Sequence, residues 1–184
     1  MKQTLLISAI IAGSVGASQA AVTAANLVAH YDFDGNADNN AGPAPNGSLE
    51  DGAVISAAGG GYDGIGQALE LGANNGRLTT TAGTHFNSLT SANKLAISFW
   101  QYDTVLGDGA ISFKLVGTTA DRGAQVHAPW RDGQIYYDTG GTGMPGNRLR
   151  INPGAPAIDQ WNHWVFQKDG AAKPWVFGCF DIAQ

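Results

Sequence analysis

The chain has very few cysteines and few charged residues. Cys179 is the only cysteine among 184 residues, so an exported domain of this length has no internal disulfide and must be held together by its hydrophobic core or by bound ions. The chain has ten basic and fifteen acidic side chains, which gives a formal net charge of −5. This balance argues against nucleic acid or an anionic membrane surface as a partner.

Long apolar runs are scarce as well. The one candidate lies in residues 1–20, where Met1-Lys2 is followed by "TLLISAIIAGSVGA" and by the small residues "SQA". Its apolar core is short and is interrupted by serine and glycine, so the pattern is typical of a secretory signal peptide rather than a membrane span. Cleavage after Ala20 is predicted to give a mature chain with no membrane span and a charge of −6, located outside the cytoplasm or in the cell envelope.

The sequence also lacks a long amphipathic helix pattern. It has 26 glycines, many aromatic residues and no internal repeat, a composition typical of an all-β domain with many turns. Short β-branched or aromatic runs between Gly, Asn and Asp clusters predict strands at residues 26–33, 67–71, 76–80, 94–103, 110–117, 124–129, 134–138, 148–152 and 163–168.

Two of these runs carry clear alternation. In "HWVFQK", Trp164 and Phe166 share one side of a strand, while His163, Val165 and Gln167 share the other. A large apolar face opposite a mixed face predicts that Trp164 and Phe166 belong to the core. In "LAISFWQY", one set of alternate residues is strongly apolar and the other holds small and aromatic side chains, which predicts a central strand.

The order and spacing of several segments resemble the laminin-G-like and concanavalin-like jelly-roll domains of secreted bacterial proteins. The segments are "LVAHYDFDGNADNNAG", "GIGQALEL", "LAISFWQYD", "QVHAPWRDGQIYYDTGG" and "WNHWVFQKDG". The resemblance covers residues 21–170 and implies an antiparallel β-sandwich of two sheets, one of them usually concave.

The tail, residues 171–184, departs from that family. It reads "AAKPWVFGCFDIAQ", and Pro174 would remove a backbone donor from a central strand. The tail is therefore interpreted as truncated or altered, and the jelly roll is expected to lack its C-terminal strands.

Concanavalin-like folds also host glycoside hydrolases, which need two carboxylates at a defined separation across the scissile bond. This chain has only two glutamates, Glu50 and Glu70, and they lie in different segments. The four histidines are scattered, and no serine lies in a nucleophile-elbow motif. The sequence names no catalytic residue and predicts a protein that is not an enzyme.

The acidic segment "DFDGNADN" has hard oxygen ligands at alternate positions, at Asp32, Asp34, Asn36 and Asp38. This spacing can wrap a calcium ion, and the resemblance implies calcium binding at loop carboxylates; Asp34 and Asp38 are the expected ligands. The alternative is an Asx-rich turn whose side chains bond to their own backbone.

The strongest ligand candidate is "HAPWRDGQIYYD", a predicted hairpin with Arg131-Asp132-Gly133 in its turn. An exposed Trp130 would stack on a sugar face, while Arg131 and Asp132 would bond to hydroxyl groups. His127 and Tyr137 complete the predicted binding residues. Tyr136 and Tyr137 point to opposite faces of the strand, so only one of them can belong to the binding site.

A structural role for the same hairpin stays open. In that alternative Trp130 covers the rim of the sandwich, and His127 pairs with Asp138 across the hairpin.

Taken together, these features predict a secreted, non-catalytic binding or adhesion module whose partner is a neutral or weakly polar glycan or surface polysaccharide. The alternatives are a glycoside hydrolase on the same fold and a passive structural spacer of the cell envelope.

Overall fold

The computed structural model describes residues 2–6, 27–72, 75–81, 94–106, 112–116, 122–139, 148–153, 158–169 and 177–180. In these residues every regular element is a β-strand, and the strands pair antiparallel wherever the register is defined. The predicted all-β class is confirmed. None of the described residues forms a helix that could span a membrane.

The chain divides into two compact units, and the first comprises Met1–Gln101 and His163–Gln184. It contains all of a two-stranded sheet, in which β2 (Ser48–Glu50) pairs with β5 (Arg77–Thr79). It also contains most of a six-stranded sheet in the order β12-β11-β6-β1-β4-β3. The strands of that sheet are β12 (Phe177–Phe180), β11 (Trp161–Asp169), β6 (Lys94–Tyr102), β1 (Lys2–Leu6), β4 (Leu69–Glu70) and β3 (Val54–Ile55).

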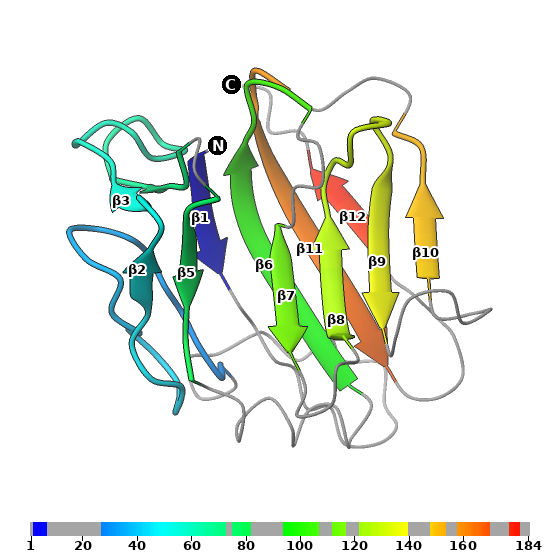
Figure 1. The fold of residues 1–184 in the computed structure, drawn as a ribbon, viewed down its shortest axis with the longest axis horizontal. Coiled ribbons are helices and arrows are strands. Elements are labelled where there is room, and N and C mark those ends of the chain that lie inside the picture. The colour runs from blue at the N-terminus through cyan, green and yellow to red at the C-terminus, as the bar shows by residue number, and fades with distance from the viewer. Residues whose placement is uncertain are drawn as a thin grey trace. The chain divides into compact units, whose positions relative to one another are not determined.

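The second unit is Tyr102–Asn162 and is built on a four-stranded sheet. Figure 1 shows its strands side by side in the order β10-β9-β8-β7. Their bounds are β7 (Phe113–Val116), β8 (Arg122–His127), β9 (Ile135–Thr139) and β10 (Arg148–Ile151). Each strand follows its neighbour in sequence, so the sheet is a simple antiparallel meander.

Strand β11 has the alternation that the sequence predicts. Trp164 is 1% exposed and Phe166 is 0% exposed, whereas His163, Val165 and Gln167 on the other side of the strand are half-buried. The ring of Phe166 lies 6.0 Å from that of Phe99 on the neighbouring β6. The assignment of Trp164 and Phe166 to the core is confirmed.

Strand β6 is central in the six-stranded sheet, between β11 and β1. Its residues 96–99 are all buried, so both faces of the strand are covered. A strand that is buried on both sides has a nearly continuous apolar sequence. The run "LAISF" is therefore typical of a central strand.

The prediction of a strand at residues 26–33 is wrong for residues 27–33, which are the ones that the structure describes. The segment 27–33 is buried at Val28, Ala29 and Tyr31, but it has no strand pairing. Phe33 adopts a left-handed backbone with φ 62°, which breaks an extended run. The backbone N–H of His30 donates to the side chain of Asn39 instead of to a neighbouring strand. The carbonyls of Val28 and His30 accept the backbone N–H groups of Ala44 and Asn40, so contacts with the following loop take the place of the predicted strand ladder.

The C-terminal tail contributes one strand, and the expectation that a jelly roll ending here lacks its C-terminal strands stays a prediction. Strand β12 pairs with β11, with Phe177 opposite Phe166 and Phe180 opposite His163. It forms one edge of the six-stranded sheet. Pro174 lies outside the described residues.

Strand β1 falls inside residues 1–20, the predicted signal peptide. It pairs with β4, where Lys2 lies opposite Glu70. Strand β4 also pairs with β3, through Leu69 and Ile55, so it would keep one partner in a chain cleaved after Ala20. Cleavage stays a prediction.

Truncating Phe166 is expected to destabilise the protein strongly, because the ring is fully buried against Phe99. Phe166→Ala should lower the free energy of unfolding by about 3–5 kcal/mol in a urea titration. The matched control is Ile65→Ala, since Ile65 is 79% exposed and its replacement should change the value by less than about 0.5 kcal/mol. A Phe166→Ala protein as stable as the Ile65→Ala protein would contradict the core assignment.

Candidate functional site

The four-stranded sheet has one polar face. Residues directly opposite each other in an antiparallel pair project from the same side, so the strand register defines two rows across the sheet. The first row is Lys114, Gln125, Asp138 and Arg148, and the second is His127, Tyr136 and Arg150. We call these seven residues the polar face.

The other side of the same sheet is apolar. Val126 lies opposite Tyr137, which lies opposite Leu149, and Ile135 lies opposite Ile151. Val126, Ile135 and Tyr137 are buried. The alternation of apolar and polar residues along β9 and β10 therefore separates an apolar side from a polar side.

The centre of the polar face is buried although it is polar. Gln125 and Asp138 are each 1% exposed, and His127 is also buried. The amide nitrogen of Gln125 donates to Nε2 of His127, while the amide oxygen of Gln125 has no hydrogen-bond partner among the described residues. Burying polar groups costs more than burying apolar side chains of similar size, so this arrangement favours a role beyond folding.

The buried carboxylate of Asp138 is bound by one guanidinium group. Arg148 donates from Nε to Oδ1 at 2.5 Å and from Nη2 to Oδ2 at 2.8 Å. This bidentate contact raises the pKa of Arg148, which is about half exposed at the surface. Arg148 thus satisfies the buried charge while leaving part of its own surface in solvent.

Tyr136 links the polar face to the hairpin between β8 and β9. The guanidinium carbons of Arg148 and Arg150 lie 5.0 and 5.9 Å from the centre of its ring. Its hydroxyl donates to Asp132 Oδ2 at 2.7 Å, and this bond raises the pKa of Tyr136. The same bond is the main cause of a lowered pKa at Asp132, with smaller contributions from the backbone N–H of Gln134 and the charge of Arg150.

The hairpin turn lies where the sequence predicts it. The backbone N–H of Trp130 donates to the carbonyl of Gln134 at 2.8 Å, and the N–H of Gly133 donates to the carbonyl of Trp130 at 2.8 Å. Gly133 has φ 76°, a conformation that glycine adopts without strain. Asp132 closes the turn by accepting the backbone N–H of Gln134 at 3.0 Å.

The turn brings the predicted ligand residues Trp130, Arg131 and Asp132 together next to His127. The half-buried Trp130 ring meets the His127 ring edge-on, with centroids 4.3 Å apart and planes inclined by 74°. The guanidinium of Arg131 lies 5.9 Å from the centre of the Trp130 ring. Arg131 and Asp132 are exposed, so a ligand can reach this group from solvent.

Tyr137 is not part of this group. It is buried on the apolar side of the sheet, and burial raises the pKa of its hydroxyl. Tyr136 is the tyrosine that reaches the hairpin, through its hydrogen bond to Asp132, whereas the predicted ligand residue Tyr137 is 1% exposed on the other side of the sheet. Alternation alone shows that the two point in opposite directions and does not show which one faces the core.

The structural alternative for the hairpin also needs correction. Asp138 lies opposite Gln125, and His127 lies opposite Tyr136. The partner of the Asp138 carboxylate is Arg148 from β10, where the sequence suggested His127. Sequence reasoning missed Arg148 and Arg150; the alternating "RLRI" of β10 was the one signal that could have placed them together on one face.

Asp34 and Asp38, the expected calcium ligands, are engaged in loop hydrogen bonds. Asp34 Oδ1 accepts the backbone N–H of Gln67 at 2.9 Å, and Asp38 Oδ1 accepts the side-chain amide of Asn46 at 2.6 Å. Their own backbone N–H groups donate to the side chains two residues earlier, as in Asx turns. Within the described ranges no three Asp, Glu, His or Cys residues are placed to share a metal ion. These contacts fit the turn alternative.

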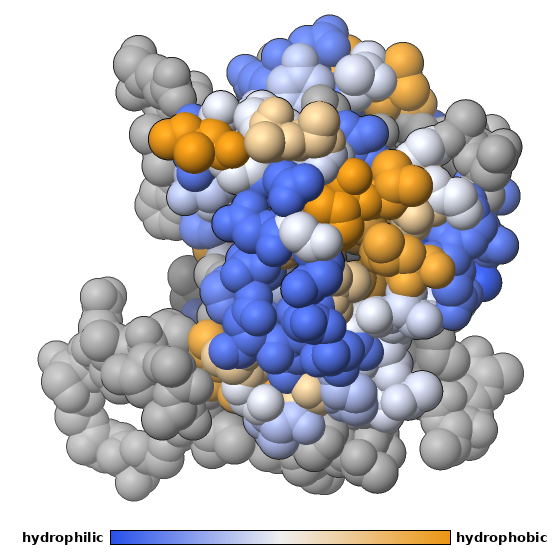
Figure 2. Space-filling view, turned by 90° about the vertical axis from the view of Figure 1, so that its left-hand side faces the viewer, coloured by the Kyte–Doolittle hydropathy of each residue, from blue (hydrophilic) through white to orange (hydrophobic). Residues whose placement is uncertain are grey.

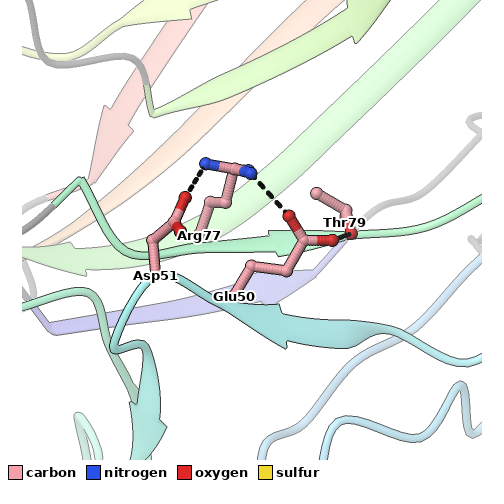
Figure 3. Close-up of polar contacts among 4 residues, drawn as sticks. All are labelled: Glu50, Asp51, Arg77 and Thr79. Atoms are coloured by element: carbon pink, nitrogen blue, oxygen red, sulfur yellow. Dashed lines mark hydrogen bonds and ion pairs between the residues drawn. The ribbon is translucent and has the colours of Figure 1, made fainter.

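Glu50, one of the two glutamates, is held in a surface ion pair on the two-stranded sheet (Figure 3). Its Oε2 lies 2.6 Å from Arg77 Nη2, and Arg77 also contacts Asp51. A hydrogen bond from Thr79 is the main cause of a lowered pKa at Glu50. Glu70 lies on β4, in the six-stranded sheet.

The side of the structure that carries β2 and β3 is largely hydrophilic, with hydrophobic residues gathered in separate groups (Figure 2). Among the exposed large apolar side chains of the first unit are Leu49, Val54 and Ile65.

A stack of three rings joins the loop residue Tyr62 to Trp100 on β6 and His163 on β11, and it was not anticipated. Tyr62 and Trp100 are parallel within 3° at 4.4 Å, and Trp100 lies 4.8 Å from His163. His163 Nε2 is hydrogen-bonded to Ser98 Oγ at 2.8 Å, and burial lowers the pKa of the imidazole. His163 on β11 is thus in contact with the buried Ser98 and with the Trp100 ring.

Comparison of the chain with protein-family models, curated proteins and solved structures finds no match.

The stability of the protein is expected to depend on pH through His163. Because burial lowers the pKa of this imidazole from its ordinary value of 6.5, the unfolded chain takes up a proton at a higher pH than the folded chain. The free energy of unfolding should therefore fall as pH decreases through 6.5 and level off below the folded pKa.

Urea titrations of the parent and of His163→Gln across this range measure the effect. The glutamine can still bond to Ser98 but cannot titrate, so the stability of the variant should lack this part of the decline. Parallel curves for the two proteins would show that His163 does not contribute.

Proposed function

We propose that the protein is an exported, non-catalytic module that binds a glycan at the polar face and the adjoining hairpin. The observation that carries this proposal is the grouping of Trp130, Arg131 and Asp132 at the end of a sheet face lined with polar and cationic side chains. Sugars present apolar CH patches and hydroxyl groups side by side, and they are bound by an aromatic ring set among such polar groups.

Each residue of the hairpin has a distinct part in this proposal. The half-buried Trp130 ring offers a surface for stacking, and it is held by the His127 ring. Arg131 supplies hydrogen-bond donors at the exposed tip. Asp132 already accepts three hydrogen bonds, from Tyr136 and from two groups of Gln134, so it mainly fixes the turn and retains limited capacity for a hydroxyl.

The state of Glu50 supports binding without cleavage. A glycosidase acid must stay protonated near neutral pH, which requires a raised pKa. The pKa of Glu50 is lowered, first by the hydrogen bond from Thr79, and its carboxylate is engaged by Arg77. Glu50 is therefore suited to a structural ion pair rather than to proton donation.

The proposed fold is the two-sheet sandwich of laminin-G-like jelly rolls. Antiparallel sheets and the separation of an apolar from a polar side in the four-stranded sheet support it. The proposed location is extracellular or in the cell envelope, on the strength of the leader pattern in residues 1–20. N-terminal sequencing that finds Met1 retained on cytosolic protein would remove the location from the proposal.

The test of the proposed function is binding by Trp130→Ala. An array of neutral and acidic oligosaccharides first identifies a ligand, and calorimetric titration then measures its dissociation constant. Because buried aromatic anchors dominate binding energy, Trp130→Ala should weaken binding by about tenfold or more. The matched control is Tyr62→Ala, which removes an exposed aromatic ring from the first unit and should leave binding unchanged.

Long incubation with the ligand should release no new reducing ends. Accumulating oligosaccharide products would show that the protein is an enzyme. A folded Trp130→Ala protein that binds as the parent does would remove the hairpin from the site.

A further inference from the structure

Cations outnumber carboxylates on the polar face and hairpin. Lys114, Arg148 and Arg150 lie on the face and Arg131 lies at the turn, against the two carboxylates of Asp132 and Asp138. The local balance is a net charge of +2 on a chain whose formal net charge is −5. A concentrated positive surface on an acidic protein attracts anionic ligands.

Both carboxylates of this surface are already occupied. Asp138 is buried and receives two hydrogen bonds from Arg148, and Asp132 accepts the Tyr136 hydroxyl and two donors of Gln134. Neither is therefore well placed to bind a cationic ligand. The positive side chains determine what the face can attract.

Arg150 is an exposed cation that keeps binding capacity for a ligand. Its Nε donates to the side-chain oxygen of Gln134, and its guanidinium lies 5.9 Å from the Tyr136 ring centre. Among the described residues no ion pair within 4.0 Å is found for Arg150, although its charge is close enough to Asp132 to contribute to the lowered pKa of that carboxyl. A guanidinium with a free edge matches the paired oxygens of a carboxylate or a sulfate.

The cations are spread over the sheet rather than gathered at one point. Lys114 is on β7 and Arg150 is on β10, three strand spacings apart, which is about 14 Å. Aromatic rings lie between the cations and at the end of the face, at Tyr136 and Trp130. Charges at intervals with rings between them suit an extended chain of sugar rings that carries charged groups.

We infer that the glycan bound by the polar face is an acidic oligosaccharide whose carboxylate or sulfate group binds to Arg150. This inference rests on the proposed glycan-binding function and replaces the neutral or weakly polar ligand that the sequence suggests. The sequence pointed to Arg131 as the only cation of the site, whereas the strand register adds Lys114, Arg148 and Arg150.

The test uses four probes of matched length in calorimetric titration: an oligogalacturonate, a sulfated oligosaccharide, a neutral oligosaccharide and oligoglutamate. At least one acidic saccharide should bind more tightly than the neutral one, and its affinity should fall as salt is raised. The stronger of the two acidic saccharides identifies the bound group as carboxylate or sulfate.

Arg150→Gln keeps an extended polar side chain but removes the charge. It should weaken binding of the acidic saccharide by about tenfold or more and leave binding of the neutral one almost unchanged. Arg77→Gln is the matched control, because Arg77 is an exposed arginine on the two-stranded sheet and its loss changes the net charge by the same amount. It should leave acidic binding almost unchanged.

Several outcomes would overturn the inference. Equal binding of neutral and acidic saccharides, with Trp130→Ala still impaired, would leave the proposed function standing and remove the acidic specificity. Binding of oligoglutamate as tight as that of the acidic saccharide, or equal losses in Arg150→Gln and Arg77→Gln, would reduce the effect to general charge attraction. Binding of none of the saccharides would remove both the function and the inference.

Discussion

The buried carboxylate of Asp138 requires a cation beside it, and the organisation of the second unit depends on this requirement. A carboxylate that is 1% exposed is costly unless it is paired and hydrogen-bonded, and Arg148 supplies both contacts from the adjacent strand. The pair joins β9 to β10 with Arg148 directly opposite Asp138. A register shift of one residue would place Arg148 opposite Tyr137 or Thr139 and take this partner away from the buried Asp138.

The same register connects the core with the proposed site. When Asp138 and Arg148 occupy one face, Tyr137 and Leu149 must occupy the other, where Tyr137 is buried. Tyr136 and Arg150 then fall on the polar side, and Tyr136 reaches Asp132 in the hairpin turn. The pairing of the buried Asp138 with the half-exposed Arg148 therefore goes together with a register that puts Tyr137 in the core and Tyr136 among the cations.

The sequence predicts well those features that depend on neighbouring residues. Alternation along one strand was sufficient to assign Trp164 and Phe166 to the core, and the Arg131-Asp132-Gly133 run was sufficient to place the hairpin turn. The sequence predicts poorly those features that depend on pairing between strands. Opposite directions for Tyr136 and Tyr137 were clear, but only the register with β8 and β10 shows which one lies beside Asp132. The strand prediction for the buried segment 27–33 was wrong for a related reason. There a hydrogen bond to Asn39 and the left-handed backbone of Phe33 stand in place of strand pairing.

Mapping the bound ligand onto the backbone by amide chemical-shift perturbation tests most directly whether the polar face is the binding surface. With an acidic oligosaccharide, the largest shifts should fall on residues 125–127, 130–138 and 148–151, which carry the hairpin turn and all of the polar face except Lys114. Residues 48–50 and 77–79 of the two-stranded sheet should remain unperturbed. Shifts centred on Tyr62 and Trp100, with none on the polar face, would place the ligand on the aromatic stack and contradict the account.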